Sequence, residues 1–379
     1  MTIASQRHLF DIPDDVAYFN AAYNAPQLRR TTEILVQSTA RKGRPWERTA
    51  PDFFDDADTL RTRAAAVLGG DADGWAIVPA ASYGLASAAN AVQERLTRGD
   101  RIVLLAEEFP SNYYCWVRAA SDTGARVDIV PKPEDGDWTR AVLARIETGV
   151  RVVSVPACHW TDGARVDLVA VGHACRSVGA FLVVDASQSL GALPLPLDEI
   201  RPDFLASAGY KWLLFPYGVS LLYVGAEWRG ARTLEMSWLA REDAQNFAGL
   251  TRYTDKLRPG ARRFDVGEAC IAALPGAIAA LEQVGAWSVP AIADSIAKIN
   301  ARIAAHLAAR GFTLPPERLR MPQMFGARLP AGYRGDLVGA LRSRSVYVSQ
   351  RGESVRFSPH LHVSDGDVAR LFLAIDSAL

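Results

Sequence analysis

The sequence predicts an α/β protein with a mostly parallel sheet and a smaller C-terminal part that mixes helices with short strands. Two observations carry this prediction. Short apolar runs alternate with helical patterns over residues 75–224, and such alternation is typical of a parallel sheet covered by helices on both faces. From about residue 270 the pattern changes to two long, Ala-rich amphipathic helices followed by short strands.

The predicted elements follow one another closely along the chain. Residues 1–30 are irregular, and a helix over 53–68 ends at Gly69-Gly70. Further helices are predicted over 85–96, 111–121, 138–147, 167–178, 271–284, 289–309, 335–343 and 365–378. Strands are predicted over 75–78, 101–106, 126–130, 151–155, 181–185, 203–207, 219–224, 323–329, 346–350 and 354–358. Residues 229–262 show no clear periodicity, so we expect a loop region over the functional site.

Composition argues against several classes of protein. Lys+Arg and Asp+Glu both number 42, so the formal net charge is zero and neither nucleic acid nor an anionic membrane is an expected partner. No apolar run approaches the roughly 18 residues of a membrane span, and residues 1–15 lack the apolar core of a signal peptide. The four Cys lie far apart, without a Cys-x-x-Cys pair. We therefore expect a reduced, cytoplasmic protein without a metal site.

An acidic residue and an isolated Lys follow two of the predicted strands. The apolar run 181–184 ends on Asp185, and Lys211 follows the strand over 203–207, far from any other Lys. Pyridoxal phosphate needs a Lys amine for its Schiff base and an Asp that keeps the pyridinium nitrogen protonated. The alternative is a surface Lys after a strand and an Asp that caps a turn. The two residues together, among small neighbours, favour the cofactor.

This stretch resembles the active-site segment of the class V aminotransferase-fold enzymes. These are fold-type I pyridoxal phosphate enzymes, and they include cysteine desulfurases, kynureninases, isopenicillin N epimerase-like proteins and carbon–sulfur lyases. The most specific pieces are 184–189 (VDASQS) and 207–214 (SAGYKWLL), and the resemblance covers about residues 18–371. It is greatest to the epimerase-like and sulfur-lyase branch.

The resemblance implies a domain layout and an assembly. Residues 1–30 would form an N-terminal segment that enters the active site, 31–265 a large cofactor-binding domain, and 266–379 a small C-terminal α+β domain. The family also implies a homodimer with active sites at the subunit interface.

Further cofactor contacts are implied by position in the family pattern. Ser82 and Tyr83 stand in a small-residue turn that opens a helix, where free backbone amides can seat a phosphate. The alternative for Ser82 is an ordinary helix N-cap. Phe109 matches the residue that stacks on the pyridine ring, although a core Phe is equally ordinary. The remaining implied cofactor contacts are Gln188 to the 3-hydroxyl, Tyr210 to the phosphate, and Ser207.

Three residues are candidates for binding the substrate. Asn24 lies in the N-terminal segment, and the alternative is an Asn in a turn before a Pro. His159 follows a strand where desulfurases have an Asn near the substrate carboxylate, and we expect it to share in catalysis; a lone His is also often structural. Arg356 lies in a short strand that resembles the one with the family's carboxylate-binding Arg. The alternative for Arg356 is a salt bridge to Asp365 or Asp367.

The resemblance implies an enzyme that acts on an α-amino acid through an aldimine and a quinonoid intermediate. Persulfide chemistry is not expected, because the C-terminal loop near 344–354 contains no Cys. Epimerisation or carbon–sulfur lysis is then the first prediction, and true transamination is the alternative. A non-catalytic cofactor-binding protein would be favoured if Lys211 or Asp185 were missing, but both are present. A nucleotide-dependent oxidoreductase would need a Gly-x-Gly-x-x-Gly turn, which the first strand lacks.

Overall fold

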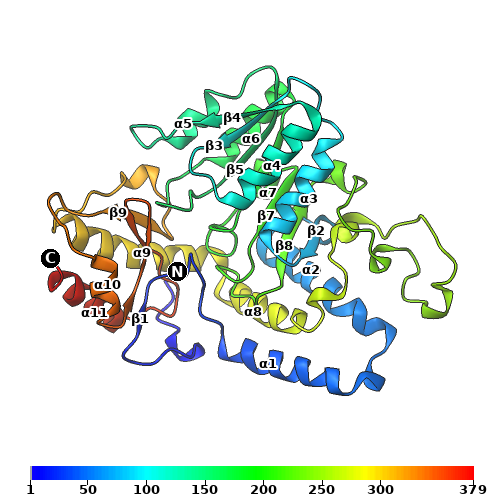
Figure 1. Ribbon diagram of the computed structural model, residues 1–379. Coiled ribbons are helices and arrows are strands. Elements are labelled where there is room, and N and C mark those ends of the chain that lie inside the picture. Colours follow the sequence, from blue (N-terminus) through cyan, green and yellow to red (C-terminus); the bar gives the residue numbers. More distant parts are fainter. Residues whose placement is uncertain (1) are drawn as a thin grey trace.

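A seven-stranded sheet forms the centre of the larger part of the molecule in the computed structural model, which describes residues 2–379 (Figure 1). The strand order is β2-β8-β7-β6-β5-β3-β4. Strand β8 runs antiparallel to both of its neighbours, β2 and β7, and the other neighbouring strands pair in parallel. The strands are β2 (Trp75–Val78), β3 (Arg101–Leu105), β4 (Arg126–Val130), β5 (Val150–Pro156), β6 (Phe181–Asp185), β7 (Phe204–Ser207) and β8 (Ser220–Val224). This arrangement confirms the predicted α/β class.

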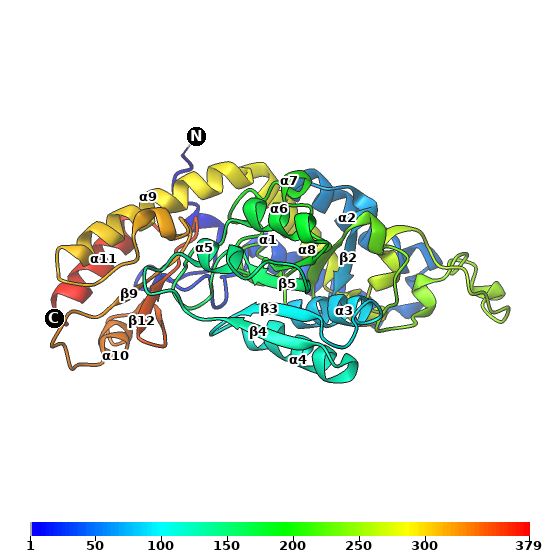
Figure 2. The same cartoon turned by 90° about the horizontal axis from the view of Figure 1, so that it is seen from above.

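Helices cover both faces of this sheet, as Figure 2 shows with α3 and α4 on one side and α6 and α7 on the other. The helices of this part are α2 (Asp55–Leu68), α3 (Ala81–Gln93), α4 (Pro110–Thr123), α5 (Trp138–Leu143), α6 (Leu168–Val178) and α7 (Leu197–Ile200). The central strands are apolar on both faces: Val183 belongs to the core cluster with α3 and α4, whereas Leu182 and Val184 belong to the cluster on the other face. Side chains alternate along a strand, so a continuous apolar run is needed to fill both layers.

A second, smaller core forms around a three-stranded antiparallel sheet with the order β11-β12-β9. Its elements are β9 (Phe325–Arg328), α10 (Leu337–Arg342), β10 (Val346–Tyr347), β11 (Ser349–Arg351), β12 (Ser354–Phe357) and α11 (Asp365–Asp376). Two long helices, α8 (Leu274–Trp287) and α9 (Val289–Ala308), precede it. The side chains of α8 lie in the core of the large sheet, whereas the C-terminal half of α9 lies in the small core. The domain boundary at 265/266 stays a prediction.

The N-terminal segment links the two parts. Strand β1 (Ala17–Tyr18) pairs in parallel with β10 of the small part. Helix α1 (Arg29–Ala40) then runs alongside α8 (Figure 1). Gly276 of α8 allows this approach, because an added Cβ there would lie 2.8 Å from the side chain of Leu35.

Two helices are absent from the sequence-based prediction. The buried positions of α1 include Thr31 and Ser38, so its inward face gives no apolar period. Helix α7 has only four residues, which is too short for a periodic signal. Helix α3 begins at Ala81, four residues before the predicted start, because the small residues of the preceding turn are already helical. Residues 229–262 contain short 3₁₀ turns and no α-helix or strand, as expected for a loop region, and they project from the large part (Figure 2). None of them lines the cavity at the strand ends described below, so their predicted position over the functional site is not supported.

Within residues 2–379, no helix combines the length and the apolar character needed to cross a lipid bilayer.

Candidate active site

A cavity of about 230 Å³ opens at the carboxyl ends of the parallel strands. Ligands bind at this edge in open α/β sheets, because the loops that follow the strands converge there. The lining residues are Ala80, Ala81, Ser82, Glu108, Phe109, Ser111, Pro156, Cys158, Trp160, Asp185, Ser187, Gln188, Ala208, Tyr210 and Lys211. Six of the predicted site residues are therefore brought together: Ser82, Phe109, Asp185, Gln188, Tyr210 and Lys211.

The turn after β6 connects Asp185 to the segment that carries Lys211. The carboxylate of Asp185 accepts a hydrogen bond from the backbone N–H of Ser187 (2.9 Å), and the Ser187 hydroxyl accepts one from the N–H of Ala208 (3.0 Å). Gly209 follows, and an added Cβ would lie 2.2 Å from the carbonyl oxygen of Val219. Glycine is therefore required for this close approach, which fixes the direction of the chain just before Lys211.

The side chain of Lys211 is buried, and its amine has no hydrogen-bond partner among residues 2–379. Its Nζ lies 5.5 Å from the ring centroid of Phe109 and 5.8 Å from that of Tyr210, and it makes no hydrogen bond or ion pair with the described residues. Burial lowers the pKa of Lys211 to about 8, although the charge of Asp185 acts in the opposite direction. A Lys with this pKa exists partly as the free amine near neutral pH, which is the nucleophilic form.

Glu108 forms part of the wall beside Asp185. Burial, and next the negative charge of Asp185, raise the pKa of Glu108 to about 8. Its Oε1 accepts a hydrogen bond from the N–H of Phe109 (2.7 Å), and its Oε2 is buried without a partner among the described residues. At neutral pH Glu108 is therefore mostly the neutral acid.

The N-terminus of α3 lines the opposite wall. Ser82 lies in its first turn, and the first turn of a helix presents free N–H groups and a positive dipole end to an anion. Tyr83 does not reach the cavity. Its hydroxyl instead donates a hydrogen bond to Glu235 Oε2 (3.1 Å). Of the two predicted phosphate contacts in this turn, the structure places only Ser82 at the cavity.

The N-terminal segment closes one side of the site. The side-chain amide of Gln188 donates to the carbonyl oxygen of Ala22 (3.0 Å), and its Oε1 accepts from the indole of Trp212 (3.1 Å). The N–H of Ala25 donates to the carbonyl oxygen of Tyr210 (3.2 Å). Asn24 is half-buried nearby but is not part of the cavity wall. The segment thus reaches the site through its backbone.

Arg356 is buried directly behind the cavity wall. Its Nη1 donates to the carbonyl oxygen of Trp160 (2.6 Å), whereas Nε and Nη2 are buried without partners in residues 2–379. Asp365 pairs with Arg302, and Asp367 pairs with Arg7, so the alternative salt bridge is not formed. Burial lowers the pKa of Arg356, with a further contribution from the positive charge of Arg351. A buried guanidinium with two open donors needs an anion.

Two predicted residues point away from the cavity. The His159 ring stacks on Trp138, 5.1 Å between centroids, and its nitrogens lie 2.8 Å from Thr161 Oγ1 and 3.2 Å from the carbonyl oxygen of Ala106. Burial lowers the pKa of His159 and so favours its neutral form. Ser207 is buried, with its hydroxyl against the carbonyl oxygen of Ala186 (3.4 Å). Adjacent residues in an extended turn face opposite sides, which is why Cys158 and Trp160 line the cavity and His159 does not.

Glu108, Cys158 and Trp160 line the cavity, and the sequence prediction missed them. Each one lies close in sequence to a predicted residue, in the 107–112 turn or the 156–163 turn. Their proximity to strand ends could have marked these residues as candidates. It could not show which of them face the cavity, because the direction of each side chain depends on the geometry of the turn.

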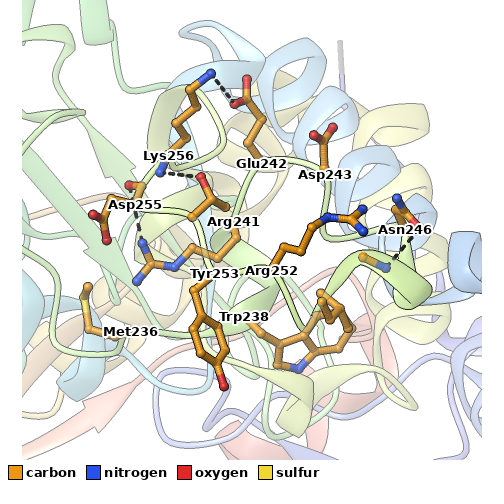
Figure 3. A pocket seen from close by; sticks show the side chains of 13 residues that line it. Met236, Trp238, Arg241, Glu242, Asp243, Asn246, Arg252, Tyr253, Asp255 and Lys256 are labelled. Carbon is orange, nitrogen blue, oxygen red and sulfur yellow. Dashed lines mark hydrogen bonds and ion pairs between the residues drawn. The ribbon is translucent and has the colours of Figure 1, made fainter.

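A larger surface hollow of about 560 Å³ lies elsewhere, in the projecting loop region (Figure 3). Its walls mix polar and apolar side chains, Lys256 pairs there with Glu242 at 3.5 Å, and its tyrosine, Tyr253, is fully exposed. It contains none of the predicted site residues. We therefore place the active site in the smaller cavity at the strand ends.

Comparison with known families agrees with this geometry. The family model described as aminotransferase class-V matches residues 23–376, which is nearly the whole chain. The chain belongs to the class-V aminotransferase family. Among curated proteins, the chain is similar to an uncharacterized aminotransferase, YcbU, of Bacillus subtilis, with 27% identity over 341 residues that cover 89% of this chain and 87% of that protein. The isopenicillin N epimerase of Streptomyces clavuligerus is 25% identical over 298 residues, 75% of each chain.

A solved structure shows the same fold as this class-V protein. A variant of C-DES with glycine covalently linked to its PLP cofactor matches with a TM-score of 0.87 and 18% identity, over 99% of this chain and 100% of that one. The fold-type I architecture predicted from the resemblance is thereby confirmed. The chain is a pyridoxal phosphate-dependent enzyme.

The residues of the cavity fit pyridoxal phosphate. A buried Lys without a hydrogen-bond partner, a carboxylate and the start of a helix surround one cavity: Lys211, Asp185 and α3. These supply an amine for the carbonyl group, a negative charge for the pyridinium and N–H donors for the phosphate. Phe109 offers a ring face beside Lys211.

Proposed function

We propose that this class-V enzyme binds an α-amino acid through Arg356 and acts at its α-carbon, in the group of epimerases and carbon–sulfur lyases. The observation that carries the proposal is a pair of buried cations without full pairing among residues 2–379: Lys211, which lines the cavity, and Arg356, which donates to the carbonyl oxygen of the cavity-wall residue Trp160. A planar guanidinium with two free donors suits a carboxylate. An amine with a lowered pKa suits proton transfer at a neighbouring carbon.

Each residue would have a defined task. Bound pyridoxal phosphate supplies a carbonyl carbon for the amine and a ring that accepts the electron pair of a deprotonated α-carbon. Lys211 would hold the cofactor, and its amine would later take and return the α-proton. Asp185 would hold a proton on the ring nitrogen by charge, and Phe109 would pack on the ring face. Arg356 would orient the carboxylate.

A persulfide-forming desulfurase is not proposed. Residues 344–354 contain no Cys. Cys158 does line the cavity, but burial raises the pKa of its thiol, and a thiol rather than a thiolate is a poor nucleophile. Transamination is the second candidate function, because YcbU, which aligns along most of the chain, is named as an aminotransferase.

The homodimer and the cytoplasmic location remain predictions. Several large apolar side chains are exposed, including Tyr23 and Tyr217 at 57% and 66%, and an interface would cover such residues. Sedimentation of the purified protein at several concentrations would test the dimer, which would be contradicted by a monomer at all concentrations.

The proposed chemistry is tested first at the cofactor. The protein with added pyridoxal phosphate should absorb as a Lys-linked cofactor, and borohydride reduction with peptide mapping should place the label on Lys211. Lys132 is the internal control, because it is partly exposed and paired with Glu107 at 3.2 Å. A label on Lys132 or elsewhere would contradict the assignment.

The reaction is tested next with a panel of amino acids. Release of a keto acid without an acceptor indicates lysis, an inverted enantiomer indicates epimerisation, and dependence on an added keto acid indicates transamination. The last outcome would replace the first proposal with the second.

A further inference from the structure

We propose that Arg351 binds a second anionic group of the substrate, so that the enzyme prefers an α-amino acid whose side chain ends in an anion. This inference rests on the proposed function, because it assumes that Arg356 binds the α-carboxylate.

Arg351 and Arg356 project from the same face of one hairpin. In the β11–β12 ladder, Ser349 lies opposite Arg356 and Arg351 lies opposite Ser354. Directly opposed residues share a face, and so do residues two apart on one strand. Arg351 and Arg356 are therefore diagonal neighbours across the two strands.

The Arg351 guanidinium lies close to the cavity. Its Cζ is 5.9 Å from the ring centroid of Trp160, which lines the cavity, and 5.8 Å from that of Tyr23 in the N-terminal segment. The charge of Arg351 also helps to lower the pKa of Lys211 and of Arg356, in agreement with this position. Its side chain is partly buried, so water reaches the group but does not surround it.

No carboxylate of the described chain neutralises either Arg. The Nη1 of Arg351 donates only to the carbonyl oxygen of Gln350 (2.7 Å). Glu353, the acid nearest in sequence, pairs instead with Arg328 (3.7 Å). Two neighbouring guanidinium groups repel each other unless anions bind them. An α-carboxylate would satisfy Arg356 and leave Arg351 without a partner.

A substrate with two anionic groups would satisfy both cations. Selection would follow from charge, since a neutral side chain would leave the positive charge of Arg351 facing it without compensation. Aspartate and glutamate are the simplest probes of this class, and asparagine and glutamine are their neutral isosteres.

The experiment is an absorbance titration of the cofactor-loaded enzyme with each member of the two pairs. A charge-assisted hydrogen bond predicts that the acid binds roughly tenfold more tightly than its amide. Arg351→Gln should remove this difference. Arg328→Gln is the matched control, because it removes a guanidinium from the same small sheet where it pairs with Glu353, and it should keep the difference.

The possible failures are distinguishable. Equal affinity for acid and amide in the wild-type enzyme would overturn the inference without any variant. If Arg328→Gln also lost the difference in affinity between acid and amide, the difference would come from the general charge of this sheet. That result would also overturn the inference. Absence of any cofactor absorbance, or of any spectral response to all four amino acids, would instead contradict the proposed function.

Discussion

Two arginines are almost completely buried in this protein, and their surroundings differ. Arg61 of α2 donates two hydrogen bonds to the carboxylate of Asp265, at 2.8 and 2.5 Å, and further ones to Asp58 (3.1 Å) and the carbonyl oxygen of Trp75 (3.3 Å). Arg356 donates a single hydrogen bond, to the carbonyl oxygen of Trp160. Both side chains are at most 1% exposed.

The difference supports a structural role for Arg61 and the proposed binding role for Arg356. A buried charge is tolerated when partners replace its lost water, and Arg61 has these partners within the chain. Arg356 lacks them within residues 2–379, and it donates to the carbonyl oxygen of Trp160, which lines the cavity that also contains Lys211. The incomplete pairing of this buried cation therefore supports its proposed ligand-binding role.

The largest effect is expected at Lys211, the second incompletely satisfied cation. Lys211→Ala removes the amine that would hold the cofactor and move the α-proton, and acid/base groups contribute about 10²- to 10⁴-fold. We expect kcat/KM to fall by at least this range. The check is turnover together with cofactor absorbance, and wild-type turnover in Lys211→Ala would remove Lys211 from the mechanism.

The comparison itself is tested by replacing each Arg with Met. Arg61→Met leaves the Asp265 carboxylate without its cation, and breaking a buried pair costs about 3–5 kcal/mol of unfolding free energy. Arg356→Met leaves no carboxylate unpaired, so it should be neutral or stabilising in the protein without substrate. Urea unfolding measures both. Equal destabilisation by the two changes would show that Arg356 has an unseen structural partner.

Arg356→Lys retains the positive charge and loses the planar, two-donor geometry. Loss of a charge-assisted hydrogen bond of about 1.5–3 kcal/mol predicts a roughly 10- to 150-fold decrease in kcat/KM. The absorbance of bound cofactor should stay the same, because Ser82, Asp185 and Lys211 are untouched. Loss of the cofactor from this variant would mean that Arg356 serves the cofactor and not the substrate.

The last prediction concerns pH and two buried imidazoles. Burial lowers the pKa of His360 to about 3 and of His362 to about 4. An unfolded His takes a proton near pH 6.5. Stability from this source is therefore complete above about pH 6.5 and decreases as the pH falls toward 4, by about 1.4 kcal/mol per pH unit for each group.

Unfolding midpoints between pH 4.5 and 7.5 would measure this slope. His360→Phe should reduce this slope. His8→Asn is the control and should leave the slope unchanged, because His8 is exposed. Glu108 changes stability in the opposite direction: because its pKa is raised in the folded protein, stability decreases as the pH rises toward 8. This contribution is the same in the wild type, His360→Phe and His8→Asn, so it does not affect the comparison of their slopes. An unchanged slope in His360→Phe would contradict the account.

The sequence by itself determined the central sheet and the core of the site. The continuous apolar runs that became β5, β6 and β7 can be buried only between two layers of helices. Asp185 and Lys211 were identified because they follow two of these strands. The carboxyl ends of parallel strands meet at one edge, so both residues had to approach the same cavity.

The tertiary structure alone decided which side chains face that cavity and which charges remain open. His159 and Trp160 are adjacent in sequence, yet only Trp160 lines the wall, because the turn directs His159 onto Trp138. The partners of a buried charge come from distant segments: Asp265 reaches Arg61 across about 200 residues, and no acid within residues 2–379 reaches Arg356. Local sequence fixes strand direction and residue type. Burial, and the pairing of charges that burial demands, depend on every segment packed around the group.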